Sequence, residues 1–422
     1  MLIFLPTELV EEIASYLDIA SIRFLRVVHS SLDQKLLRHF KERFFRKLTI
    51  RWNLEDLEKL VGVVSHPHLG TALQHLVIDA TPHYAMRLWK IRTRIVTRDT
   101  VEQNMDFRSP HHSEYAEIKE RGEEAARFWN ETRHDQKTLT TLFGKMHVLQ
   151  SITFSYDGMD RSHGKFGRRY CETSQNEMSL PFVSTMAAIA TSGIVVRQIL
   201  VHEEKGYGAV SIGRIESLSP LLSKFSAVLQ NLTILKLDLR DWRTPDEGFE
   251  PPIGRAPFIV RFLSKCTALH ALRLSAYSNF EPELFAEIAK HCSYPFLESC
   301  ELELFEIRAL CDLFKFLDPA KTRLRTLSLS CIKSHDVRTK WPDVLRRIAL
   351  DYTLSNLTLK NNFDMIGCRI GFGDIGYESS ITLQSPGLQS ALLQYTDQLH
   401  LTTFGPPWRN AAVAYPFIGL GA

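Results

Sequence analysis

The stretch CTALHALRL, residues 266–274, is the clearest copy of a pattern that recurs through the second half of the chain. Apolar residues stand at Leu269, Leu272 and Leu274, in the order apolar-x-x-apolar-x-apolar. Such alternation is typical of a short strand with one buried face. Chance also produces such triplets, so their spacing matters more than the pattern itself. Other strong copies open at Leu232, Leu297, Leu324 and Leu354, which makes the successive intervals 37, 28, 27 and 30 residues.

Amphipathic helix candidates separate these copies. A strand, a turn and a helix that repeat about every thirty residues predict a solenoid, because each unit can bury its apolar face only against its neighbours. We therefore expect an α/β fold with short parallel strands on one side and helices on the other. A less regular α/β domain is the alternative. The helix candidates are residues 258–266, 282–292, 307–317 and 341–350, and weaker triplets open at Phe45, Leu73, Leu149 and Val196.

Three short helices are predicted before the first triplet. Pro6 suits the first position of a helix over 5–17, and Leu9, Ile13, Tyr16 and Leu17 would form its apolar stripe. A second helix is expected over 20–28. A third should begin near Ser31, where Ser31 and Gln34 match a capping box and Leu32, Leu36 and Phe40 share one face. So small a core would gain by docking on a partner. The alternative is a helical cap on the larger domain.

The same N-terminal residues resemble the F-box motif, L-P-x-E-L-x-x-x-I-x-x-x-L followed by I-x-x-L-R-x-V. The resemblance covers about a tenth of the chain. It departs from the family at residues 29–33, where the family often has Cys or Ser followed by an aromatic residue. It implies contact with the Skp-type adaptor of cullin–RING ubiquitin ligases through the apolar residues of the first two helices. The adaptor-binding residues that the resemblance implies are Leu5, Pro6, Leu9, Ile13, Leu17, Ile22, Leu25 and Val28.

The triplets in turn resemble the leucine-rich repeats of many F-box proteins, especially divergent fungal ones. The two resemblances together imply an F-box over 1–44, a degenerate repeat domain over 45–361 and a C-terminal cap or tail over 362–422. Within the repeat domain, the polar residues 84–136 are expected to be an insertion, and residues 157–179 a polar loop. Glycines and prolines after Asn361 predict irregular structure. The implied function is a substrate receptor of an SCF-type ligase that holds a protein client.

Composition restricts the compartment and the class of protein. The formal net charge is +3 among 422 residues, which by itself favours neither nucleic acid nor an acidic partner. No apolar run is long enough to span a membrane, and Pro6 ends the first one too early for a secretory signal. Seven cysteines without a C-x-x-C pair fit free thiols in a reducing compartment, so we expect the cytoplasm or nucleus.

Motifs that carry catalysis are not found. The segment 371–376 has the glycines of a dinucleotide fingerprint but lacks a strand before it and a helix after it. His111, His112, Glu114 and Glu117 lie in the polar insertion without a cysteine at ligand spacing. We therefore expect no enzyme activity, no cofactor and no metal.

Two basic clusters, at 87–98 and 161–169, contain interleaved aromatic residues. Such clusters can bind nucleic acid, and this is an alternative function, as is a protein scaffold outside any ligase. Residues 113–133 are rich in Glu, Lys and Arg and are expected to form an exposed helix. A solvated face that pairs with this helix is the favoured interpretation of the basic clusters, so nucleic acid is not an expected partner.

The client surface is predicted from strand alternation. Side chains between the buried positions should point to the opposite face of the sheet. The residues expected on that face are Lys236, Asp238, Arg273, Ser275, Glu301, Glu303, Ser328, Ser330, Thr358 and Lys360. The predicted client contacts among them are Lys236, Arg273, Glu301 and Glu303. A mixed charge of this kind suits a charged peptide or a folded client.

Overall fold

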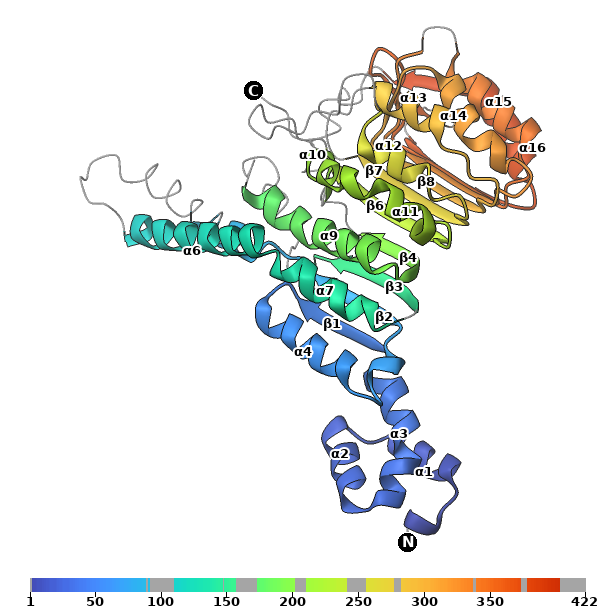
Figure 1. The fold of residues 1–422 in the computed structure, drawn as a ribbon. Helices are drawn as coiled ribbons and strands as arrows, with labels where there is room; N and C mark the ends of the chain where they lie inside the picture. Colours follow the sequence, from blue (N-terminus) through green and yellow to red (C-terminus); the bar gives the residue numbers. More distant parts are fainter. Residues whose placement is uncertain are drawn as a thin grey trace.

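The computed structural model describes residues 2–88, 90–91, 110–146, 148–156, 173–201, 210–240, 256–276, 282–336, 339–372 and 378–402. A small helical unit lies at the N-terminal end, and a long sheet covered by helices forms the rest (Figure 1). In the described part of the chain, no helix is both long and apolar enough to cross a lipid bilayer.

The helical unit has its own hydrophobic core, separate from that of the sheet. Its elements are η1 (Leu2–Phe4), α1 (Thr7–Ser15), α2 (Ile19–Val28) and α3 (Ser30–Phe44). The core consists of Val10, Ala14, Ile22, Leu32, Leu36 and Phe40. The predicted stripe of α1 was therefore displaced by one residue, because Val10 and Ala14 face inward in place of Leu9 and Ile13.

The helix starts differ in detail from the predictions. Pro6 is the residue before α1, not its first residue. The carboxylate of Asp18 caps α2 by accepting the Ser21 N–H at 2.8 Å. The predicted capping box at Ser31 and Gln34 was wrong, since α3 begins at Ser30 and the His29 ring caps it by accepting the Ser31 N–H at 3.1 Å.

Ten strands follow one another in an almost entirely parallel sheet, and β5 (Val210–Ser211) adds an eleventh beside β6. This confirms the predicted α/β class with parallel strands. Among the described strands of this sheet, only the last pair is antiparallel. In spatial order the ten strands are β1 (Lys47–Arg51), β2 (His75–Asp79), β3 (Val148–Ser155), β4 (Val195–Val201), β6 (Ile234–Arg240), β7 (Ala271–Ala276), β8 (Ser299–Glu303), β10 (Thr326–Ser330), β12 (Asn356–Lys360) and β14 (Ser380–Gln384).

Helices connect consecutive parallel strands and pack along one face of the sheet (Figure 1). The main ones are α4 (Leu54–Ser65), α7 (His134–Gly144), α9 (Thr173–Ser192), α11 (Leu222–Leu229), α12 (Phe258–Leu263), α13 (Pro282–His291), α14 (Leu310–Leu317), α15 (Trp341–Asp351) and α16 (Leu388–Asp397). Shorter elements are η2 (Gly70–Ala72), α10 (Ile212–Ile215), η4 (Glu216–Leu221), η5 (Asp318–Ala320), β9 (Glu306–Ile307), β11 (Lys333–Ser334), β13 (Arg369–Gly371) and β15 (His400–Thr402).

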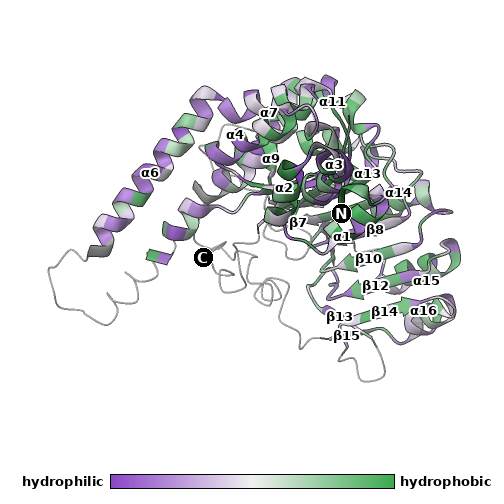
Figure 2. Ribbon diagram, turned by 90° about the horizontal axis from the view of Figure 1, so that it is seen from below, coloured by the Kyte–Doolittle hydropathy of each residue, from purple (hydrophilic) through white to green (hydrophobic). Residues whose placement is uncertain are grey.

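The apolar positions of each triplet form continuous buried rows across the strands, and Figure 2 shows the apolar residues along the sheet. Leu235, Leu272, Cys300, Leu327 and Leu357 are paired in register and are all buried. The helices cover this face, so the alternate residues of the same strands lie on the other one.

A turn with the same backbone conformation follows three successive strands. Leu304, Cys331 and Asn361 each stand directly after a strand and have positive φ, between 49° and 64°. The Leu304 N–H donates to the Ser330 carbonyl at 2.9 Å, and the Cys331 N–H donates to the Lys360 carbonyl at 2.7 Å. The Asn361 N–H donates at 2.7 Å to the carbonyl of Ser379, the residue before β14. The same turn therefore follows β8, β10 and β12, each time with a positive φ and a backbone hydrogen bond.

The predicted insertion over 84–136 is less polar than expected. Residues 83–88 and 90–91 are helical, and α6 (Pro110–Thr132) projects from the body (Figure 1). Ala85, Leu88 and Ile118 are nevertheless buried in the main core. The two helices pack closely, since a Cβ at Gly122 would lie 3.3 Å from that of Tyr84.

Two loop predictions were wrong for part of their range. Residues 173–179, at the end of the predicted polar loop, belong to α9, while 157–172 lie outside the described residues. The segment after Asn361 was expected to be irregular, but it contains β13, β14, α16 and β15. Of these, β14 extends the main sheet and α16 packs on α15.

Candidate functional site

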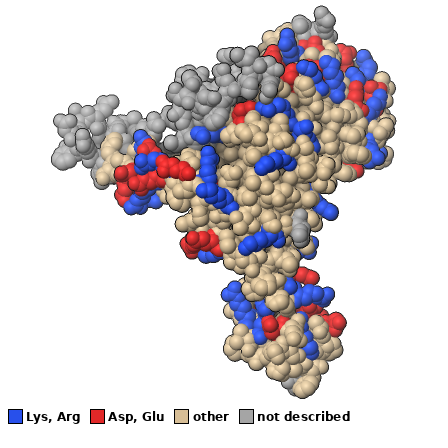
Figure 3. Space-filling view, viewed as in Figure 1, with Lys and Arg blue, Asp and Glu red and all other residues tan. Residues whose placement is uncertain are grey.

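The first helix of the helical unit exposes apolar side chains in a row. Leu9, Ile13 and Tyr16 are 46%, 40% and 83% exposed, at spacing that places them on one side of α1. Because Val10 and Ala14 already supply the core of the unit, these three side chains remain available to another molecule. Figure 3 shows that the outer end of the unit is largely uncharged.

The second helix adds to this exposed apolar surface. Phe24 and Val27 are 71% and 87% exposed, and Val28 is also exposed. Among the described residues, eight of the sixteen exposed large apolar side chains lie between Phe4 and Val28. We call these eight the apolar face: Phe4, Leu9, Ile13, Tyr16, Ile19, Phe24, Val27 and Val28. Such a concentration in so short a segment makes this unit a candidate for an interaction surface.

The predicted adaptor-binding residues are distributed over this unit in three ways. Leu9, Ile13 and Val28 belong to the apolar face, and Pro6 is also exposed. Leu5, Leu17 and Leu25 are half-buried against the core of the unit. Ile22 is fully buried, so it supports the unit and offers no surface to a partner in this conformation. Motif matching missed Phe4, Tyr16, Ile19, Phe24 and Val27 as contact residues, and their exposure reveals them.

Polar contacts from α3 fix the position of α1. The Lys35 ammonium donates to the carbonyls of Ile3 and Leu5, both at 2.7 Å. Arg38 forms two hydrogen bonds with the carboxylate of Glu11 and so lowers the pKa of Glu11 below its ordinary value. These contacts hold the start of the chain against α3, so the apolar face is presented on a preorganised support.

The predicted client residues lie together on the sheet face opposite the one that the described helices cover. Lys236, Arg273 and Glu301 are register partners on β6, β7 and β8. Asp238, Ser275 and Glu303 form the next row in the same direction. We call these six residues the charged ladder. Asp238 and Ser275 are buried, which contradicts the prediction that they are solvent-facing strand residues.

Within the charged ladder, opposite charges partly satisfy each other. The Arg273 guanidinium lies 3.8 Å from Glu301 and 3.7 Å from Glu303. The Ser275 hydroxyl donates to Glu303 at 3.1 Å. Glu301 is the more accessible acid, with its side chain 46% exposed against 19% for Glu303. The ladder is therefore a polar network of buried and partly buried side chains.

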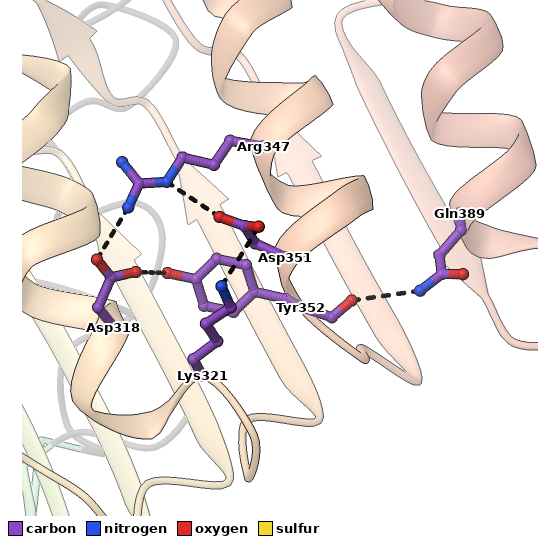
Figure 4. A network of polar contacts seen from close by, with 6 residues as sticks. All are labelled: Asp318, Lys321, Arg347, Asp351, Tyr352 and Gln389. Carbon is purple, nitrogen blue, oxygen red and sulfur yellow. Dashed lines mark hydrogen bonds and ion pairs between the residues drawn. The ribbon is translucent and has the colours of Figure 1, made fainter.

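A second polar network lies among the helices and connects neighbouring units (Figure 4). Asp318 accepts hydrogen bonds from the Arg347 guanidinium at 2.9 Å and the Tyr352 hydroxyl at 2.7 Å. Burial and the Asp318 carboxylate raise the pKa of Tyr352 above its ordinary value. Asp351 pairs with Arg347 and with Lys321. The network ties η5 to α15, which is a structural role.

The buried cysteines in the described part of the chain are not in surroundings that activate a thiol. Burial raises the pKa of Cys292 to about 11, and the pKa values of Cys266 and Cys300 are also raised, so these cysteines are poor nucleophiles. No group of His, Cys, Asp and Glu there could hold a metal ion. Residues 373–377 of the glycine-rich segment are outside the described ranges.

The basic clusters are mostly outside the described residues as well. Arg87 and Lys90 are exposed on the helical segment before the gap, whereas 92–98 and 161–169 are not described.

A comparison with protein-family models finds no match to this chain, and a comparison with curated proteins finds no similar one.

Proposed function

We propose that this chain is an F-box protein, a substrate receptor of an SCF-type cullin–RING ubiquitin ligase. The observation that carries the proposal is the apolar face of α1 and α2. Its residues Leu9, Ile13 and Val28 are the motif positions through which the F-box resemblance implies adaptor contact. A helical unit with its own core and an uncovered apolar side is what such docking requires.

The remainder of the chain would hold the client. Parallel strands in register, repeated turns after β8, β10 and β12, and helical connections between consecutive parallel strands support a degenerate leucine-rich-repeat solenoid. In this proposal the charged ladder, on the sheet face opposite the described helices, binds a charged peptide or folded client. Ubiquitin transfer is done by other subunits, and this chain supplies proximity.

One capture experiment tests both halves of the proposal. The full chain, carrying an affinity tag, is mixed with purified Skp-type adaptor and cullin and also with a cell extract. Wild type should retain adaptor and cullin. Leu9→Ser with Ile13→Ser should lose both and keep its clients. Lys236→Glu with Glu301→Lys should keep adaptor and cullin and lose clients, because it reverses two partly exposed charges but leaves Arg273 paired with Glu303.

Failure of the wild-type chain to retain purified adaptor would contradict the F-box assignment. Client recovery that is unchanged by the charge reversal would move the client site away from the ladder. Melting temperatures of both double variants serve as folding controls, since all four substituted side chains are at least partly exposed.

A further inference from the structure

The main sheet ends at β14, whose outer edge has no strand partner among the described residues. Strand β14 pairs with β12 alone, in five consecutive antiparallel positions from Ser380 to Gln384. An edge of this kind presents a row of backbone N–H and C=O groups that another strand can pair with.

Two backbone hydrogen bonds at the ends of β14 determine which of its residues direct their backbone groups outward. The Asn361 N–H donates to the Ser379 carbonyl at 2.7 Å, and the Ser385 N–H donates to the Ser355 carbonyl at 3.0 Å. In an antiparallel pair the bonding direction alternates along the strand. Ile381 and Leu383 lie two and four residues after Ser379, and Ser385 is two residues further on. The backbone N–H and C=O groups of Ile381 and Leu383 therefore point toward β12, like those of the two serines. Ser380, Thr382 and Gln384 therefore direct their N–H and C=O groups to the open edge.

This edge lacks the protection that natural edge strands usually carry. Its sequence, Ser-Ile-Thr-Leu-Gln, contains no charged residue and no proline, and the register has no bulge. The strand at the opposite end of the sheet is different. Strand β1 has Lys47 and Arg51 at its two ends and contacts α3. The unprotected edge is thus confined to the C-terminal end of the sheet.

The sequence of β14 is also suited to pair with itself. With a two-fold axis through Thr382, an antiparallel copy places Ser380 opposite Gln384, Ile381 opposite Leu383, and Thr382 opposite Thr382. Apolar side chains then meet on the helix-covered face, where Ile381 is buried, and polar side chains meet on the other face. Thr382 directs its backbone outward, so the residue on the axis can exchange both hydrogen bonds with its counterpart.

We propose that two copies of this chain associate through their β14 strands, antiparallel and with Thr382 on the two-fold axis, to form one continuous sheet. The interface is isologous, because the same strand is used by both partners. Ser380, Thr382 and Gln384 of each copy donate to and accept from the other. The contact is short and largely a matter of backbone pairing, so the dimer is expected to be concentration-dependent and weak. It does not depend on the F-box proposal.

Substitutions at Thr382, an exposed residue, test this pairing. Thr382→Pro removes an N–H that points away from β12, so the pair with β12 should survive while the outer edge is blocked. Thr382→Val is the matched control, since it keeps the N–H. Thr382→Lys and Thr382→Glu place like charges opposite each other across the axis, which opposes pairing. An equimolar mixture of these two variants places opposite charges there and should restore it.

The measurement is sedimentation velocity of the full chain over a hundredfold concentration range. We expect wild type and Thr382→Val to shift from monomer to dimer, and Thr382→Pro, Thr382→Lys and Thr382→Glu to stay monomeric when alone. The Lys and Glu mixture should dimerise again, because self-pairing brings the two residues at position 382 together. Wild type that remains monomeric throughout, or a dimer that persists in the Lys variant, overturns the proposal. If Thr382→Pro fails to fold, the Lys and Glu variants still decide it.

Discussion

Leu304, Cys331 and Asn361 occupy a left-handed backbone conformation that an L-residue adopts at a cost of about 1–2 kcal/mol. Of the three residues, Asn361 should adopt this conformation at the lowest cost, because asparagine is several times more common at positive φ than other non-glycine residues. The next residue, Asn362, is buried and accepts the Ile332 N–H while donating to the Leu329 carbonyl. Single residues thus fix the turn between one unit and the next.

We expect position 361 to accept glycine but not a β-branched residue. Asn361→Val should destabilise the fold by about 1–2 kcal/mol, because a β-branched side chain is poorly accommodated at positive φ. Asn361→Gly should be close to neutral, since glycine adopts this conformation freely. Urea denaturation of both variants and wild type provides the comparison. Equal midpoints for the Val and Gly variants would show that the conformation at this position carries no cost.

The buried carboxyl group of Glu177 should make the stability of the fold depend on pH. Glu177 on α9 accepts the backbone N–H groups of Tyr84 and Ala85, at 3.1 and 3.0 Å, and so caps the helical segment that begins at residue 83. Burial raises the pKa of Glu177 from 4.5 to about 7, although the two hydrogen bonds oppose the rise. The folded state therefore binds this proton more tightly than the unfolded state does, and stability should fall as pH rises from about 4.5 to about 7.

Glu177→Gln should remove this contribution, because the amide does not titrate. The free energy of unfolding of both proteins is measured by denaturation at several pH values. The value for the variant minus the value for wild type should increase as pH rises from about 4.5 to about 7. A difference that stays constant over that interval would mean that the carboxyl titrates alike in both states.

At the scale of elements, each strand contributes its triplet to one buried face. Leu272 and Leu327 are 2% and 0% exposed, on β7 and β10. Leu327→Ala should therefore destabilise the fold by about 2–5 kcal/mol. Leu350→Ala is a matched control, since that leucine is 69% exposed on α15 and its loss should matter little. If calorimetric melting gives the two variants the same temperature, the register of β10 is misassigned.

Alternation made the strands around Leu272 and Leu327 predictable from sequence, because apolar residues with a period of two, repeated at a regular spacing, are typical of half-buried strands. The same alternation could not show that Asp238 and Ser275 are buried, since that depends on residues distant in the chain. It also could not reveal β14 and α16, because glycines and prolines surround them. The motif identified the helical segment that carries the apolar face. Which residues of that segment point outward depends on how α1 packs on α3.

On the scale of the whole molecule, two surfaces lie on parts with separate cores. The apolar face belongs to the helical unit at one end, and the charged ladder lies on the sheet strands β6 to β8 (Figure 1). The chain passes from α3 through Phe45 to β1 within a few residues. A receptor that holds a client at a fixed place relative to an adaptor would need such a division, with docking and recognition on different surfaces.

The most direct test of the F-box assignment is a calorimetric titration of purified Skp-type adaptor into the full chain. Wild type should bind. Leu9→Ser with Ile13→Ser should weaken binding roughly thirtyfold or more, because covering these half-exposed side chains is worth about 2 kcal/mol in total. Leu350→Ser with Leu393→Ser, which changes two exposed leucines on α15 and α16, should bind like wild type. Absence of binding by wild type, or equal affinity in both double variants, would contradict the assignment.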